Sequence, residues 1–146
     1  MDLVLALETT TDTCSVGLGN DESLSVISQH APRQHSEILL SMVDRMVKSS
    51  GVARSDIECV AFSAGPGSFT GVRLGAAVAQ GIAEAWGALV CPVPTAEAMA
   101  RQVAAWQTEL TEFHLARPSR QHLAYISTFN TKGGELACTE SDRLLD

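Results

Sequence analysis

The chain has 146 residues, 45% of them hydrophobic, which is enough for one domain with a buried core but not for two complete domains. Its 10 basic and 17 acidic residues give a formal net charge of -7, and no run of lysines and arginines alternates with aromatic residues, so tight autonomous binding to nucleic acid is not expected. The N-terminus lacks the basic and apolar regions of a signal peptide, and no apolar run approaches ~20 residues, so we expect a cytoplasmic protein that does not cross a membrane.

Three strands are expected first, over residues 3–10, 14–20 and 23–29. The first is almost continuously apolar, which is typical of a buried central strand. The connections between the three are too short to hold a crossover helix. We therefore expect them to pair as antiparallel hairpins.

Helices and strands then alternate along the chain. Over residues 36–49, apolar side chains recur at i, i+1, i+4 and i+5, which predicts an amphipathic helix, and Gly51 is placed to end it. The next expected elements are a strand over 57–64, a glycine-rich loop, a helix over 69–86, a strand over 88–94 and a helix from Thr95 to about 108.

The order β-β-β-α-β-α-β-α predicts an α/β protein with a mixed five-stranded sheet covered by helices. It is the element order of the ribonuclease-H-like fold, whose duplicated form makes the actin-like ATPases. After this domain, over residues 1–108, the polar stretch 111–121 is interpreted as a connection, and 122–129 with 134–140 as one β-hairpin. Residues 109–146 are thus expected to begin an incomplete second domain.

The glycine-rich stretch, residues 61–81, reads AFSAGPGSFTGVRLGAAVAQG. No lysine stands where a Walker A loop needs one, and the glycine spacing does not fit the dinucleotide motif. Gly71, Gly75, Ala79 and Ala83 instead form one row of small residues, four apart, along the expected helix. Since a glycine inside a helix costs about 1 kcal/mol relative to alanine, the row needs a compensating close contact. Packing on the chain's own sheet and docking of a partner helix both remain open.

Other candidate sites are weaker. Glu8, Thr9, Thr10 and Thr11 could make a weak nucleotide or phosphate contact at a hairpin, or Glu8 could simply cap the threonine turn. The four cysteines, the histidines and Ser68 show no metal-ligand or catalytic spacing, so we predict neither a metal site nor a catalytic residue.

Three segments together resemble the bacterial TsaB family, also called YeaZ. They are GPGSFTGVRLG (65–75), LALETTTDTCSVGL (5–18) and HSEILLSMVD (35–44), and the likeness extends over about residues 1–105. The resemblance implies an actin-like ATPase fold and a noncatalytic subunit that binds and activates the catalytic subunit TsaD. With the ATPase TsaE, these proteins transfer threonylcarbamoyl to adenosine 37 of tRNAs that read codons beginning with A.

The resemblance also implies where partners bind. The helices over 36–49 and 69–86 would form the interface with TsaD, through an exposed apolar stripe that also supports a homodimer when the partner is absent. The chain alone would bind no cofactor, ATP or ADP would have a place only at the interface of the complex, and tRNA would be contacted only indirectly. The interface residues implied are His35, Leu39, Met42, Met46, Gly71, Arg73, Leu74, Gly75, Val78 and Ala79.

An autonomous small ATPase or kinase of the actin-like superfamily is the alternative. It is disfavoured because Glu8 stands where the phosphate loop of those enzymes begins with aspartate, and because a second domain is needed to close a nucleotide cleft. His35 is followed four residues later by Leu39, so the histidine pair of the catalytic relative's metal site is missing. The family's second domain opens with an Asp-Ala-Arg, whereas residues 127–136 read STFNTKGGEL, so we expect a short or divergent member.

Overall fold

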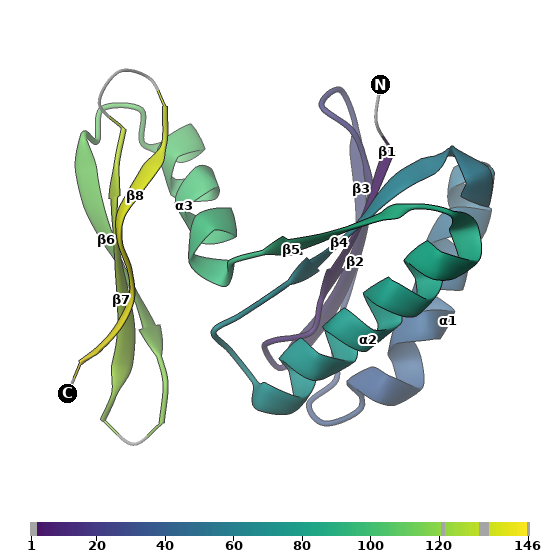
Figure 1. Ribbon diagram of the computed structural model, residues 1–146, viewed down its shortest axis with the longest axis horizontal. Coiled ribbons are helices and arrows are strands. Elements are labelled where there is room, and N and C mark those ends of the chain that lie inside the picture. The colour runs from purple at the N-terminus through teal and green to yellow at the C-terminus, as the bar shows by residue number, and fades with distance from the viewer. Residues whose placement is uncertain (1–2, 121, 132–134, 146) are drawn as a thin grey trace. The chain divides into compact units, whose positions relative to one another are not determined.

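A computed structural model describes residues 3–120, 122–131 and 135–145. The chain divides into two compact units, Met1–Val93 and Pro94–Asp146 (Figure 1). We expected the first domain to end near residue 108, and this domain boundary stays a prediction. The two compact units meet earlier in the chain, between Val93 and Pro94, so the helix that follows Pro94 belongs to the second unit.

The first unit contains a five-stranded mixed sheet in the order β3-β2-β1-β4-β5. The first three strands form antiparallel hairpins, as predicted, while β1 runs parallel to β4 and β4 runs parallel to β5. The strands are β1 (Leu3–Glu8), β2 (Thr13–Gly19), β3 (Leu24–His30), β4 (Ile57–Ser63) and β5 (Leu89–Val93). The predicted mixed five-stranded sheet is confirmed.

One long helix follows the three antiparallel strands, and a second follows β4. They are α1 (His35–Ser50) and α2 (Phe69–Trp86), and a short 3-10 helix, Arg54–Asp56, precedes β4. Each long helix ends at a glycine in the left-handed conformation, Gly51 with φ 70° and Gly87 with φ 72°, where a side chain would be strained. The predicted extents of both helices are therefore confirmed to within a residue or two.

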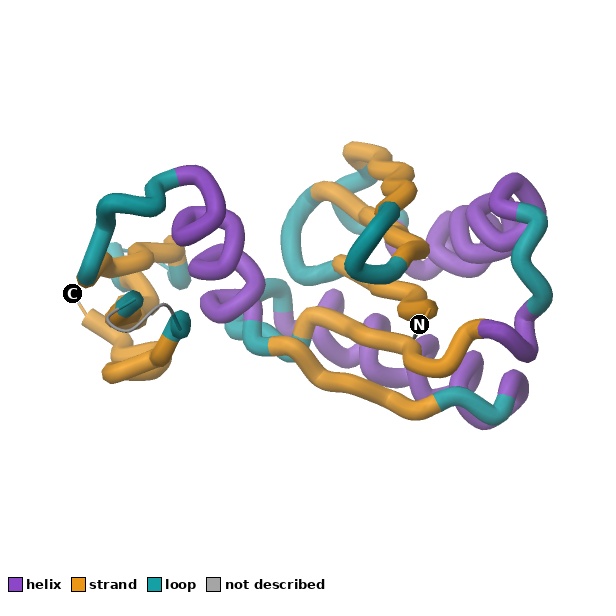
Figure 2. The backbone as a smooth tube through the Cα atoms, turned by 90° about the horizontal axis from the view of Figure 1, so that it is seen from above, coloured by secondary structure: helices purple, strands orange, loops and turns teal. Residues whose placement is uncertain are grey.

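Both helices share one hydrophobic core with a single face of the sheet (Figures 1 and 2). Alternate residues of the strands, such as Leu5 and Leu7 of β1, point into this core, while Ala6 between them is exposed. Helix α1 contributes residues that its amphipathic pattern predicted, including Leu39 and Met42, and α2 contributes Ile82. This packing fixes the position of the loop that joins β4 to α2.

The second unit joins one helix to a three-stranded antiparallel sheet in the order β6-β7-β8. Its small core contains Ala96, Ala100 and Phe129, and the rings of Phe113 and Phe129 stack with centroids 5.8 Å apart. The elements are α3 (Thr95–Trp106), β6 (Glu112–Pro118), β7 (Ala124–Asn130) and β8 (Ala137–Leu145).

The interpretation of residues 111–121 as a connection was wrong. Residues 112–118 form β6, because Phe113, Leu115 and Arg117 alternate toward the interior with the period of a strand. Pro118 lies at the end of β6, where it does not interrupt the strand. The expected hairpin corresponds to β7 and β8. The second strand was predicted to begin at residue 134, which lies outside the described residues. Within the part of the chain that the structure describes, no helix is long and apolar enough to cross a bilayer.

Candidate functional site

The turn between β1 and β2 lies against the start of α2. Thr9 and Thr10 in this turn are buried, with exposed fractions of 1% and 4%. Thr9 Oγ1 donates a hydrogen bond to the carbonyl of Gly71 at 2.7 Å, and the amide of Ser68 donates to the carbonyl of Thr10 at 2.8 Å. Thr9 and Gly71 are 62 positions apart in the sequence. The threonine turn and the glycine loop are thus joined directly by hydrogen bonds.

The glycines allow the loop and the start of α2 to approach the threonine turn this closely. A Cβ atom at Gly71 would lie 1.9 Å from the carbonyl oxygen of Thr9, and one at Gly75 would lie 2.8 Å from Thr9 Oγ1. Gly67 approaches Thr10 in the same way, with a distance of 2.5 Å from its ideal Cβ to the threonine Cβ. Of the two explanations left open for the row of small residues, the structure supports packing within the chain.

Glu8 has a structural role at the same turn. Its Oε1 accepts hydrogen bonds from the backbone amide of Thr10 at 2.5 Å and from Thr10 Oγ1 at 2.6 Å. The carboxylate therefore caps the threonine turn. Thr11 is exposed, and its hydroxyl bonds locally to Thr13. A phosphate contact by these four residues stays a prediction.

Six of the ten predicted interface residues are buried in the interior of the first unit. Leu39, Met42, Met46, Gly71, Gly75 and Ala79 are all buried. The helix sides that carry these six residues face the sheet and the threonine turn, so the six are not part of the chain's exposed surface, and their assignment to a partner interface stays a prediction. The other four are at least partly accessible: His35, Arg73, Leu74 and Val78.

A second row of small residues faces outward on α2. Ala77, Gly81 and Ala85 are four apart, and all three are exposed. No atom lies within 4 Å of an ideal Cβ at Gly81, so nothing in the described chain requires glycine there. Leu74 and Val78 lie half-buried beside this row. From the sequence alone this row cannot be told from the buried one, because both have small residues four apart on the same helix.

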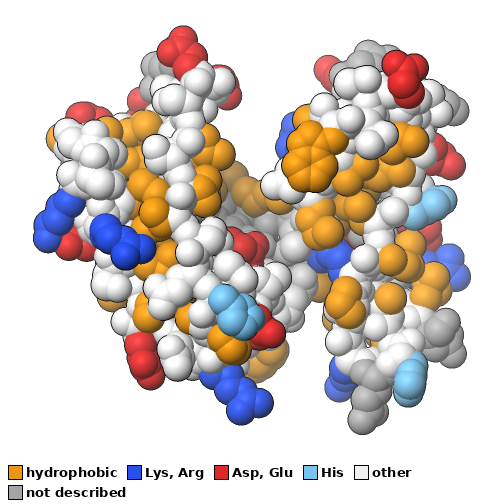
Figure 3. Space-filling model, turned by 180° about the vertical axis from the view of Figure 1, so that it is seen from behind, with side chains coloured by type: hydrophobic (Ala, Val, Ile, Leu, Met, Phe, Trp, Pro, Cys, Tyr) orange, Lys and Arg blue, Asp and Glu red, His pale blue; other side chains and the backbone are white. Residues whose placement is uncertain are grey.

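Larger hydrophobic side chains also reach the surface of both units (Figure 3). Near the helices of the first unit these include Leu40 of α1, 59% exposed, and Phe69 at the start of α2, 69% exposed. The guanidinium of Arg73 lies 3.7 Å from the centroid of the Phe69 ring, in cation–π geometry. The outer face of α2 therefore combines small residues, apolar residues and one held positive charge.

A polar groove of 580 Å³ opens where the threonine turn meets the first turns of α1 and α2. Within the described chain, His35 Nε2 is buried there without a hydrogen-bond partner. The groove combines hydroxyl groups, Arg33 and two helix N-termini, which favour an anion, with the carboxylate of Asp12, which opposes one. Its lining is Thr9, Thr11, Asp12, Arg33, His35, Ser36, Ser68, Thr70, Gly71 and Leu74.

The four cysteines are free thiols. Burial raises the pKa of Cys14, and the charge of Glu8 raises it further. Burial also raises the pKa of Cys59, with a smaller contribution from Cys91, whose thiol lies beside it on the neighbouring strand β5. No cluster of three or more metal-ligating side chains occurs among the described residues.

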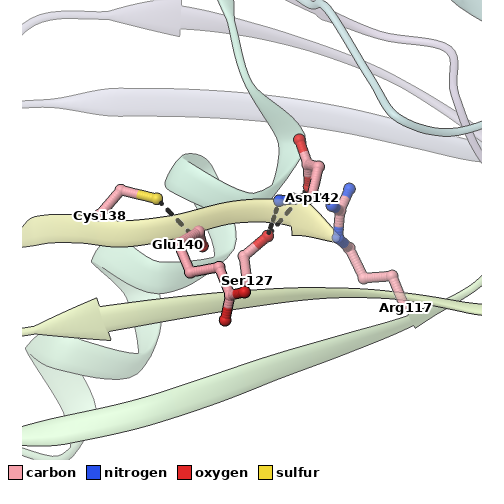
Figure 4. A network of polar contacts seen from close by, with 5 residues as sticks. All are labelled: Arg117, Ser127, Cys138, Glu140 and Asp142. Carbon is pink, nitrogen blue, oxygen red and sulfur yellow. Dashed lines mark hydrogen bonds and ion pairs between the residues drawn. The ribbon is translucent and has the colours of Figure 1, made fainter. Parts of the chain in front are cut away.

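The second unit contains a polar network that the sequence did not indicate (Figure 4). Arg117 of β6 is buried and pairs with Asp142 of β8, whose carboxylate also accepts a hydrogen bond from Ser127 Oγ at 2.9 Å. Ser127 Oγ in turn accepts from the amide of Asp142 at 3.0 Å. The network joins all three strands of this sheet, so its role is to hold them in register.

Comparison with known proteins gives a consistent result. Residues 23–134 match the family model described as TsaD, tRNA N6-adenosine threonylcarbamoyltransferase. The chain is 44% identical over 80 residues to the tRNA threonylcarbamoyladenosine biosynthesis protein TsaB of Escherichia coli, covering 55% of this chain and 35% of that protein. It is 41% identical over 98 residues to TsaB of Haemophilus influenzae, covering 67% and 42%.

A solved structure shows the same fold. YeaZ from Pseudomonas aeruginosa superposes with a TM-score of 0.86 at 33% identity, over 99% of this chain and 68% of that one. The chain spans less than half the length of the two curated relatives above.

Proposed function

Since the chain belongs to the TsaB (YeaZ) family, within the wider family that the TsaD model describes, we propose that it is a noncatalytic subunit of the assembly that makes N6-threonylcarbamoyladenosine in tRNA. Its role is to bind and activate a TsaD-like catalytic subunit, and the modified position is adenosine 37 of tRNAs that read codons beginning with A. The assembly works in the cytoplasm.

A noncatalytic role is supported by how the chain uses its most distinctive motif. The glycine loop and the threonine turn bond to each other, through Thr9 with Gly71 and through Ser68 with Thr10. The carboxylate of Glu8 is engaged by Thr10. The motif that identifies the family therefore stabilises the junction of α2 with the sheet.

The observation that carries the docking proposal is the outward row Ala77, Gly81 and Ala85 on α2. A glycine in an exposed helix interior costs about 1 kcal/mol relative to alanine, and within the described chain Gly81 gains no contact in return. Small residues four apart let the backbone of a second helix approach closely. We place a helix of the TsaD-like partner there, with Leu74 and Val78 as its apolar contacts.

The flanking predicted residues are assigned to the rim of this interface. Arg73, held against Phe69, supplies a positive charge beside the row, and His35 lies at the start of α1. TsaE would join through the complex, ATP or ADP would bind only at the interface with the partner, and tRNA would be contacted indirectly. The same helix face would support a homodimer when the partner is absent.

Binding is tested by size-exclusion chromatography with light scattering, on this chain mixed with a bacterial TsaD. The variant Gly81→Leu should abolish the heterodimer while leaving the fold intact, because leucine is a good helix former and its side chain meets open space. Gln80→Leu is the matched control, since residue 80 is also exposed but points about a quarter turn away. Equal binding by wild type and Gly81→Leu would refute this docking face.

An autonomous small ATPase remains the second candidate, and the polar groove is the observation that favours it. Its hydroxyls and helix N-termini suit a phosphate group. Calorimetric titration of ATP into the chain alone tests it, with Thr11→Val and Thr70→Val removing two groove hydroxyls. Binding and turnover that these variants abolish would replace the noncatalytic proposal.

A further inference from the structure

Two of the four free cysteines lie side by side in the first sheet. Strands β4 and β5 pair in parallel, with Cys59 opposite Leu89 and Ala61 opposite Cys91. These four residues form the corners of one square, and the two cysteines stand at diagonal corners. Since side chains two apart on a strand share a face, both cysteines lie on the same face, and their thiols are within hydrogen-bonding reach of each other. The pair depends on strand register, so the spacing of the cysteines in the sequence does not show it.

The pair lies on the face of the sheet opposite to α1 and α2. Val60 and Phe62 of β4 point into the core that the helices cover, so Cys59, next to Val60, points the other way. Cys59 is half-buried, while Cys91 is exposed on the edge strand β5. The pair is therefore accessible to a small ion from solution.

A disulfide does not fit this diagonal arrangement. Two residues along a strand and one strand across put Cα atoms about 8 Å apart. A disulfide cannot join Cα atoms more than about 7 Å apart unless the backbone moves, and here the backbone belongs to two hydrogen-bonded strands. An ion held between the two sulfur atoms bridges a wider gap, because two metal–sulfur bonds span more than one sulfur–sulfur bond.

We propose that Cys59 and Cys91 form a two-thiolate site for a soft monovalent cation, Cu(I). Thiolates select Cu(I), zinc and iron–sulfur clusters. Structural zinc takes four ligands and iron–sulfur clusters take four cysteines, whereas the described residues contain no group of three metal-ligating side chains. Of these, Cu(I) is the ion that is stable with two sulfur ligands in a line. On binding, two copper–sulfur bonds form and two S–H protons pass to solvent, with no change in oxidation state.

The neighbours of the pair also suit a soft ion. The other two corners of the square are the apolar side chains of Leu89 and Ala61. On the other side of β4, Val4 of β1 lies opposite Cys59. None of these side chains has an oxygen or nitrogen atom that would favour a hard cation such as Mg²⁺. This site lies on the sheet and does not depend on the function proposed above.

Binding is tested with Cu(I) alone, added without oxygen to the reduced full chain in competition with a chromogenic copper chelator. We expect one Cu(I) per chain, together with the ultraviolet absorption of a copper–thiolate complex. Cys91→Ser should weaken binding at least about a hundredfold, because the second thiolate of one chain acts at high effective concentration. Cys138→Ser is the matched control, since it removes another exposed thiol and should bind like the wild type.

A second variant moves the thiol instead of removing it. Val90 pairs with Val60, on the face that the helices cover. Cys91→Ser combined with Val90→Cys therefore keeps four thiols but turns one away from Cys59, and it should bind as weakly as Cys91→Ser alone. Circular dichroism checks that each variant is folded.

Three results would overturn the proposal. Equal affinity of the wild type and Cys91→Ser would show that the pair is not the site. Wild-type affinity in the variant with the moved thiol would show that the diagonal arrangement is irrelevant. A copper complex that contains two chains by light scattering would mean that the ion bridges thiols of different chains.

Discussion

The helix α2 carries two rows of small residues with the same spacing and opposite surroundings. The row of Gly71, Gly75 and Ala79 lies against the threonine turn and the sheet, so that a single added methyl group has no room at Gly71. The row of Ala77, Gly81 and Ala85 faces open space. Spacing four apart therefore identifies a surface of close approach, but only the neighbouring elements decide whether the approaching backbone belongs to this chain or to another.

The largest expected effect is at the buried row. Gly71→Ala places a methyl group 1.9 Å from the carbonyl oxygen of Thr9, which is backbone and cannot turn away. The helix must shift and the bond from Thr9 to Gly71 is lost, so we expect a free energy of unfolding lower by about 3 kcal/mol. Urea unfolding followed by circular dichroism measures this. A loss of less than about 0.5 kcal/mol would show that the turn yields easily.

The hydrogen bond at the same contact should give a smaller loss. Thr9→Val keeps the shape of the side chain but removes the hydroxyl that donates to the carbonyl of Gly71 at 2.7 Å. The carbonyl then stays buried without that donor, and we expect a loss of about 1–2 kcal/mol in unfolding free energy. Thr9→Ser is the matched control, because it retains the hydroxyl and loses only a methyl group. A Thr9→Val chain as stable as the wild type, beside a destabilised Thr9→Ser chain, would mean that the methyl group and not the hydrogen bond stabilises the junction.

The exposed row should respond in the opposite direction. Gly81→Ala adds a methyl group in open space and improves helix propensity, so the isolated chain should gain up to about 1 kcal/mol. The same urea measurement compares it directly with Gly71→Ala. A destabilised Gly81→Ala chain would mean that residue 81 is already packed, and that the row is not available to a partner.

Much of the first unit could be predicted from the sequence because its signals are local. The change from period two to the helical pattern, and glycines such as Gly51 at helix ends, locate the hairpins and both long helices. The interior contact of Thr9 with Gly71 could not be found this way, since the two residues are 62 positions apart and small residues look the same on either side of a helix. The buried pair of Arg117 with Asp142 was missed for the same reason, because it depends on the pairing of three strands.

The sheet also has covered and open surfaces, and the reactivity of its cysteine thiols distinguishes them. This is the smallest of the effects that we expect. Cys14 lies on the helix-covered face, and burial together with the charge of Glu8 raises its pKa. Cys91 is exposed, while burial raises the pKa of its half-buried neighbour Cys59. Since iodoacetamide reacts with the thiolate, labelling near pH ~8 should proceed fastest at Cys91, more slowly at Cys59 and slowest at Cys14.

The pH dependence of labelling gives a second test, because ionisation of the buried Cys14 thiol lowers the stability of the fold. A thiol whose pKa is raised in the folded state disfavours the fold once it ionises, so the contribution of Cys14 is complete below the ordinary pKa of a thiol and is lost as the pH rises through the raised value. Labelling of Cys14 should therefore rise more steeply with pH than that of the exposed Cys138, as peptide mass spectrometry can follow. Equal rates at Cys14 and Cys138 would mean that α1 leaves the sheet face over β2 often enough to expose it, and that this side of the sheet is no better covered than the open surface.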